Sequence, residues 1–133
     1  MSIKTFGVIG AGQMGNGITQ VAAMSGLNVI MNDIKDEFVE RGLATITKIL
    51  ARNVDKGKMT DDEKNAVLGR IKTSVSLKDM ASADFVVEAA VENEGLKFQI
   101  FKELDEICQP GVILATNTSS IPVSYTHLRA HET

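Results

Sequence analysis

The chain has little cysteine, no long hydrophobic run and no strong excess of charge of either sign. Its one cysteine, Cys108, excludes an internal disulfide and a cysteine-based metal cluster, and it is typical of a reducing cytosol. No apolar run is long enough to cross a bilayer, and the apolar stretch near residue 1 is too short for a signal peptide. A net charge of −3, with scattered basic residues, argues against a nucleic-acid partner. We therefore expect a cytoplasmic protein with no membrane or nucleic-acid partner and no metal site.

The residues that are present are those of an ordinary soluble domain. Hydrophobic residues make up 44% of the chain and charged residues 23%. A length of 133 residues suits one domain with one core, and we find no internal repeat or low-complexity linker.

Short apolar runs alternate with amphipathic stretches along the whole chain. This alternation predicts an α/β fold, a Rossmann-like doubly wound parallel sheet with helices on both faces. The stretches at 36–53 and 60–68, the second opened by a Thr60–Glu63 capping box, predict a helical-hairpin insertion that we expect to contact a ligand. The predicted strands are 4–9, 28–32, 71–75, 84–88 and 112–115, and the other predicted helices are 14–25, with its apolar positions at Ile18, Val21 and Ala22, and 96–107.

A glycine-rich segment, Gly10-Ala11-Gly12-Gln13-Met14-Gly15, joins the first predicted strand to the first predicted helix. In this GxGxxG pattern Gly10 permits a tight turn, Gly12 lets a pyrophosphate approach the backbone, and Gly15 lets helix and strand pack closely. The N–H groups at the helix start then face the phosphates. Because glycine-rich turns also arise for structural reasons, the context of a strand–helix–strand unit is what favours dinucleotide binding.

Asp33 ends the second predicted strand, about 20 residues after the glycines, where a ribose-binding acid is expected. Its carboxylate would repel the additional phosphate of NADP, so the sequence predicts NAD as the cofactor. The alternative is that Asp33 is only a turn residue or a helix N-cap.

Further motifs make the pattern more specific. The GxGxMGxGI segment, Asp33, the segment Val87-Glu88-Ala89-Ala90-Val91-Glu92-Asn93, Lys97 and the segment Thr116-Asn117-Thr118-Ser119-Ser120 together resemble the 3-hydroxyacyl-CoA dehydrogenase family, with its bacterial 3-hydroxybutyryl-CoA members nearest. The resemblance covers about residues 3–120. It implies an NAD-dependent oxidoreductase of fatty acid metabolism that interconverts 3-hydroxyacyl-CoA and 3-ketoacyl-CoA by hydride transfer.

The resemblance also implies roles for individual residues. Glu92 and Lys97 would line the nicotinamide side of the NAD site; their alternative is a solvated pair near a helix start. Ser119 would hydrogen-bond the 3-oxygen of the acyl-CoA substrate and Asn117 would shape the same turn, although this segment could be only a cap after a strand.

Two lysines of the insertion have the weakest assignments. Lys56 falls where the family contacts the CoA moiety, and Lys58 lies two residues further on. An exposed loop without a ligand explains both lysines equally well.

The final residues depart from the family pattern. The family continues with a helix, a strand carrying a catalytic His about 20 residues beyond Ser119, a partner Glu, and a helical domain with the oligomer contacts. His127 and His131 fit neither position nor context, and residues 123–133 resemble a translated sequencing adapter. We therefore expect an incomplete NAD-binding domain at 1–122 and a non-native tail, the alternative being a divergent natural terminus.

The resemblance implies that the full-length protein is a homo-oligomer and that this chain alone lacks the catalytic His and Glu. A nucleotide-binding module without turnover stays an alternative, as does part of a multifunctional fatty-acid oxidation protein. The start at Met1 argues against the multifunctional protein.

Overall fold

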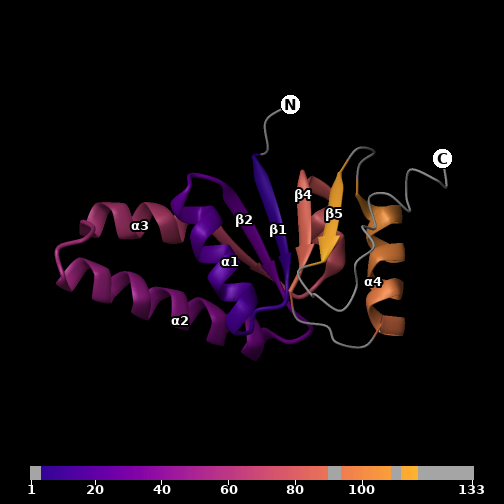
Figure 1. Cartoon of the computed structure of the whole chain (residues 1–133), viewed down its shortest axis with the longest axis horizontal. Coiled ribbons are helices and arrows are strands. Elements are labelled where there is room, and N and C mark those ends of the chain that lie inside the picture. Colours follow the sequence, from indigo (N-terminus) through magenta and orange to yellow (C-terminus); the bar gives the residue numbers. More distant parts are fainter. Residues whose placement is uncertain (1–3, 90–93, 109–111, 117–133) are drawn as a thin grey trace.

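A five-stranded parallel sheet with strand order β3-β2-β1-β4-β5 forms the centre of the molecule (Figure 1). The structure is a computed structural model that describes residues 4–89, 94–108 and 112–116, and in 94–97 and 113–116 only the backbone is described. The chain starts in the middle of the sheet, moves outward to β3 and returns to the other side of β1. The predicted doubly wound topology is confirmed. The strands are β1 (Thr5–Ile9), β2 (Asn28–Asn32), β3 (Ile71–Ser74), β4 (Phe85–Glu88) and β5 (Ile113–Thr116).

Helices cover both faces of the sheet. They are α1 (Gln13–Met24), α2 (Asp36–Asp55), α3 (Asp61–Gly69), the 3-10 helix η1 (Leu77–Ser82) and α4 (Glu94–Ile107). Neighbouring residues of a strand point to opposite faces, so Val8 packs in one hydrophobic cluster and Ile9 in the other. The first cluster contains residues of α1, α2 and α3, and the second contains residues of η1 and α4.

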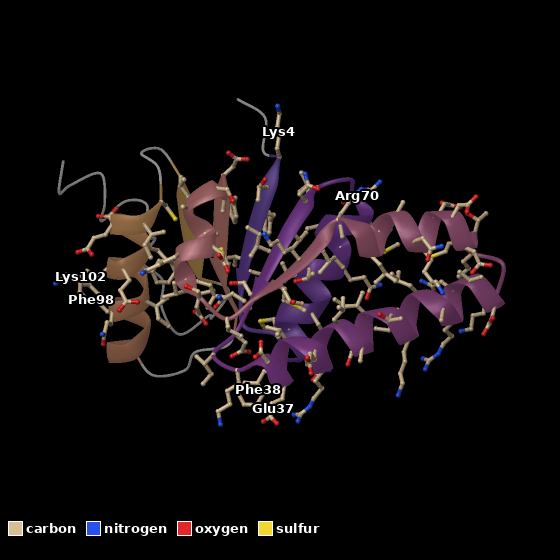
Figure 2. All side chains as sticks on the ribbon, turned by 180° about the vertical axis from the view of Figure 1, so that it is seen from behind. Lys4, Glu37, Phe38, Arg70, Phe98 and Lys102 are labelled. Carbon is tan, nitrogen blue, oxygen red and sulfur yellow. The ribbon has the colours of Figure 1, made fainter. Side chains whose placement is uncertain are left out.

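The helices α2 and α3 form the predicted hairpin, which projects sideways from the sheet (Figure 1). Thr60 caps α3 through a capping box: its hydroxyl accepts the Glu63 N–H at 3.1 Å, and the Glu63 carboxylate accepts the Thr60 N–H at 3.1 Å. Arg70, which follows α3 (Figure 2), donates from Nη1 to the Ala23 carbonyl oxygen at 2.8 Å. This bond ties the base of the hairpin to the end of α1.

Three details differ from the sequence-based expectation. The strand predicted to reach Val75 ends at Ser74, and η1 was not predicted, because its six residues are too short for a periodic pattern. Val21, which lies in the predicted apolar stripe of the first helix, is 66% exposed. The apolar spacing predicted the helix correctly. It did not show that Val21 would lie on a face of α1 that the other described residues leave exposed.

Cys108 is buried, and its Sγ lies 3.5 Å from the Met80 carbonyl oxygen. Among the described residues, no three His, Cys, Asp or Glu side chains gather as they would around a metal ion. No helix in the described ranges has the length and hydrophobicity needed to span a bilayer.

Candidate functional site

The glycine-rich loop lies at the switch point of the sheet. It follows β1, whose neighbours are β2 on one side and β4 on the other, and the chain leaves β1 toward β2 before returning to β4. In open α/β sheets the loops at such a point separate and leave a crevice beyond the carboxyl ends of the strands. The carboxyl ends of β1 and β4 are therefore where a ligand is expected.

The three glycines of the loop differ in what the structure requires of them. Gly10 has a φ of 111°, in the region that side-chain-bearing residues rarely adopt. A Cβ at Gly15 would overlap the Gly10 carbonyl oxygen, so this glycine allows α1 to sit directly against the end of β1. A Cβ at Gly12 would meet nothing within 4 Å, and its φ of −70° suits any residue. Neither packing nor backbone conformation within the described residues explains a glycine at position 12, whereas a ligand beside it would.

The start of α1 leaves donors for an anion. Gly12 is the N-cap and no side chain caps the helix, so the first N–H groups, at Gln13 and Met14 among others, have no partner within the helix. The first turn contains no acidic residue, and Met14 is 51% exposed. Free N–H groups at the positive end of a helix dipole suit a phosphate.

Asp33 joins the end of β2 to the glycine loop. Its Oδ2 accepts the Ala11 N–H at 2.8 Å, and its Oδ1 accepts the Ile34 N–H at 2.7 Å. The N-cap of α2 is Lys35, which excludes the alternative that Asp33 caps this helix. The half-buried carboxylate keeps further acceptor sites, because each oxygen has more than one lone pair.

A polar cluster in which Asn32 and Ser74 are buried lies next to Asp33 and was not predicted from the sequence. The Asn32 side chain donates to the Ser74 hydroxyl at 3.1 Å, and that hydroxyl lies 2.6 Å from the Asp79 carboxylate. The Asn32 carbonyl oxygen accepts the Gly10 N–H at 2.7 Å, and the Ser74 carbonyl oxygen accepts the Asp33 N–H at 3.1 Å. The cluster thus links the glycine loop, the end of β2 and the start of η1. The sequence did contain a signal for this cluster: the neighbouring parallel strands β2 and β3 both end in a polar residue, Asn32 and Ser74.

These features together fit a dinucleotide. The open space at Gly12 and the uncapped start of α1 would hold a pyrophosphate, and Asp33 would accept ribose hydroxyls. The structure brings together all of Gly10, Ala11, Gly12, Gln13, Met14, Gly15 and Asp33 at this edge.

The other predicted site residues do not join this group in the described structure. Lys56 and Lys58 are exposed at the tip of the α2–α3 hairpin. α2 has 20 residues and is about 30 Å long, so this tip is far from the Asp33 end of the helix. Lys97 lies in α4, but its side chain is outside the described part. Also outside the described residues are Glu92, Asn117, Ser119, His127 and His131.

Comparisons with known proteins agree with this geometry. The chain is 54% identical over 119 residues to a probable 3-hydroxybutyryl-CoA dehydrogenase of Deinococcus radiodurans, covering 90% of this chain and 42% of the relative. The crystal structure of (S)-3-hydroxybutyryl-CoA dehydrogenase from Ralstonia eutropha is similar with a TM-score of 0.90 and 47% identity, covering 96% of this chain and 45% of that one. The fatty acid oxidation complex subunit alpha of Psychrobacter arcticus is 41% identical, covering 92% of this chain and 17% of the relative.

The chain therefore spans less than half the length of these relatives. The family described as "3-hydroxyacyl-CoA dehydrogenase, NAD binding domain" matches residues 5–131, which is nearly the whole chain. This match confirms the predicted cofactor, NAD. The chain belongs to the family of NAD-binding domains of 3-hydroxyacyl-CoA dehydrogenases.

Proposed function

We propose that this chain is the NAD-binding platform of an enzyme that interconverts 3-hydroxyacyl-CoA, with 3-hydroxybutyryl-CoA as its foremost substrate, and 3-ketoacyl-CoA. The observation that carries the proposal is the glycine loop at the switch point, joined through the Ala11 N–H to the Asp33 carboxylate. The names of the relatives support the substrate class. When bound, NAD supplies the hydride chemistry of the reaction.

The described residues would bind and orient the cofactor. The N–H groups at the start of α1 and the open side of Gly12 would hold the pyrophosphate, and Asp33 would accept hydrogen bonds from the hydroxyl groups of the adenosine ribose. Because a second anion beside Asp33 would be repelled, this arrangement favours NAD over NADP.

The roles nearer the reaction rest on the family resemblance. Glu92 and Lys97 would lie on the nicotinamide side, and Ser119, with Asn117 shaping the turn, would donate a hydrogen bond to the 3-oxygen of the substrate. The general acid–base His would belong to the part of the relatives that this chain does not span. This chain by itself would then bind NAD without turnover.

Contacts with CoA and with other subunits are also part of the proposal. Lys56 and Lys58 would contact the phosphates of CoA, which their exposure at the hairpin tip permits. Homo-oligomerisation of the whole protein rests on the resemblance, and a cytoplasmic location rests on the chain having a single cysteine.

A second setting for the same activity is a multifunctional protein. The 41% identity to the fatty acid oxidation complex subunit alpha of Psychrobacter arcticus favours it, whereas the 54% identity to the Deinococcus relative favours a separate dehydrogenase. We propose the separate dehydrogenase because the identity to it is higher over a similar share of this chain.

A fusion protein tests the proposed activity. The part of the Deinococcus relative that follows the matched region is joined after Pro122, and the oxidation of NADH by acetoacetyl-CoA is followed by absorbance. We expect turnover by the fusion protein and none by this chain alone, because a positioned acid–base group accounts for about 10²–10⁴-fold in rate.

Variants of the fusion protein test the assigned hydroxyl. Ser119→Ala should lower kcat/KM by roughly 10- to 100-fold, since a hydrogen bond to a charged group contributes about 1.5–3 kcal/mol. Ser82→Ala, which alters an exposed serine of η1, serves as the control. A folded fusion protein that binds NADH but does not act on acetoacetyl-CoA would contradict the proposed substrate class.

A further inference from the structure

Gly42 is a glycine in the middle of the long helix α2, where alanine would be the better helix former. It is buried, and its position faces the glycine loop rather than solvent. A Cβ at Gly42 would lie 2.7 Å from the Ala11 carbonyl oxygen, 3.1 Å from the Ala11 Cβ and 3.2 Å from the Met31 Cε. The first of these contacts is with backbone, which cannot move aside as the end of a side chain can.

The close approach of α2 to the Ala11 carbonyl oxygen indicates the direction of one peptide group. The Ala11 carbonyl belongs to the same peptide as the Gly12 N–H, and the described chain has no cis peptide bond. In a planar trans peptide the C=O and N–H point in opposite directions. With its oxygen against α2, this peptide directs the Gly12 N–H away from α2.

The Gly12 N–H therefore faces the open side of the loop. Among the described residues it donates no hydrogen bond, and a Cβ built on Gly12 would meet nothing within 4 Å. The preceding peptide is held separately, because the Ala11 N–H donates to Asp33 Oδ2 at 2.8 Å. Ala11 is thus held at its N–H by Asp33, the residue after β2, and its carbonyl oxygen lies against α2; the residue is only 3% exposed.

We propose that Gly42 is a positioning residue for cofactor binding: its lack of a side chain lets α2 hold the Ala11–Gly12 peptide so that the Gly12 N–H faces the dinucleotide pyrophosphate. The proposal rests on the proposed function of this chain as an NAD platform. It gives α2 a role at its sheet-proximal part that is separate from the CoA contact assigned to its distal tip.

Titration of Gly42→Ala with NADH, followed by cofactor fluorescence, tests the proposal. We expect the Kd for NADH to rise about tenfold or more, the size of losing one hydrogen bond to a charged oxygen. The matched control is Gly69→Ala, another glycine-to-alanine change in a helix, where a Cβ would meet nothing within 4 Å and the Kd should stay within twofold of the parent chain. A folded Gly42→Ala chain with the parent Kd would overturn the proposal.

A measurement on the unaltered chain covers the case in which Gly42→Ala does not fold. In a two-dimensional ¹H–¹⁵N spectrum, the amide resonance of Gly12 should shift strongly when NADH is added and also when inorganic pyrophosphate is added. A Gly12 resonance that stays in place at saturating NADH would contradict the inferred peptide direction. If the unaltered chain does not bind NADH at all, the proposed function fails, which distinguishes that outcome from the failure of the inference.

Discussion

Asp33 and Gly42 show how single residues could be predicted at this site to different degrees. The spacing of Asp33 from the glycines predicted its place near the loop, and the structure adds that its carboxylate accepts the Ala11 N–H. The close approach of Gly42 to the glycine loop was not predicted, because a helical glycine among apolar positions gives no sign of what it faces. Contacts between segments 31 residues apart in the chain depend on the tertiary packing of α2 on the loop.

Gly12→Val should abolish tight cofactor binding while leaving the fold in place. Apart from the two neighbouring residues in the chain, no described atom lies within 4 Å of a Cβ at this position, and its φ is −70°, so we expect the chain without ligand to accommodate the valine. The same side chain would occupy the approach of the pyrophosphate. We expect the Kd for NADH to rise about 100-fold or more, which corresponds to about 2.8 kcal/mol. Fluorescence titration and circular dichroism of the same sample measure binding and fold, and a folded variant with unchanged affinity would show that the loop is not the site.

At the scale of elements, the sequence predicted the strands and helices that carry a period or a cap. β2 was predicted with its observed bounds, and α3 was predicted from Thr60 and Glu63, whose capping box is present. The 3-10 helix η1 was not predicted from the sequence, although its Met80 is fully buried in the second hydrophobic cluster. Short irregular segments are fixed by what they pack against, and their own sequence contains too few residues to show a period.

Thr60→Ala should lower the free energy of unfolding by about 1 kcal/mol, the usual loss for an N-cap hydroxyl. Both hydrogen bonds of the capping box disappear or weaken, and the start of α3 frays. Thr45→Ala, in the exposed middle of α2, is the control and should not destabilise the chain, because alanine favours a helix interior. Urea denaturation measures both variants, and equal stability of Thr60→Ala and the parent chain would contradict the capping role.

The start of β1 is held by an acid from the neighbouring strand connection. Asp84 Oδ2 accepts the Lys4 and Thr5 N–H groups, each at 3.0 Å. The hydrogen bond from Thr5, then that from Lys4, lowers the pKa of Asp84 below its ordinary value of 3.8. Since the folded-state pKa lies below the unfolded-state value, this stabilisation is complete above about pH 4 and is lost as the pH falls through the lowered pKa.

Asp84→Asn should therefore be less stable than the parent chain at pH 7, and the difference should shrink as the pH falls below 3.8. Thermal unfolding at a series of pH values measures the difference. Asp55→Asn, at the exposed end of α2, controls for the loss of one negative charge. A stability difference between Asp84→Asn and the parent chain that is the same at pH 7 and pH 3 would argue against this role of the carboxylate.

For the whole molecule, the order of the strands explains why cofactor residues from distant segments meet. The switch between β1 and β4 places the loop after β1 at a crevice, and the neighbouring β2 brings Asp33 to the same edge. The alternation of strands and helices was sufficient to predict this topology. The residues assigned to the nicotinamide and the substrate, Glu92 and Ser119 among them, lie outside the described part, so their roles stay predictions.

Titration of the unaltered chain with NADH and with NADPH, at the same ionic strength, tests the cofactor assignment most directly. We expect NADH to bind at least about tenfold more tightly, a difference of about 1.4 kcal/mol, because Asp33 accepts ribose hydroxyls and repels a 2′-phosphate. Asp33→Asn should narrow the difference, since it removes the charge and keeps the size of the side chain. Equal affinity for the two cofactors would contradict the role of Asp33, and no binding of NADH would contradict the NAD platform itself.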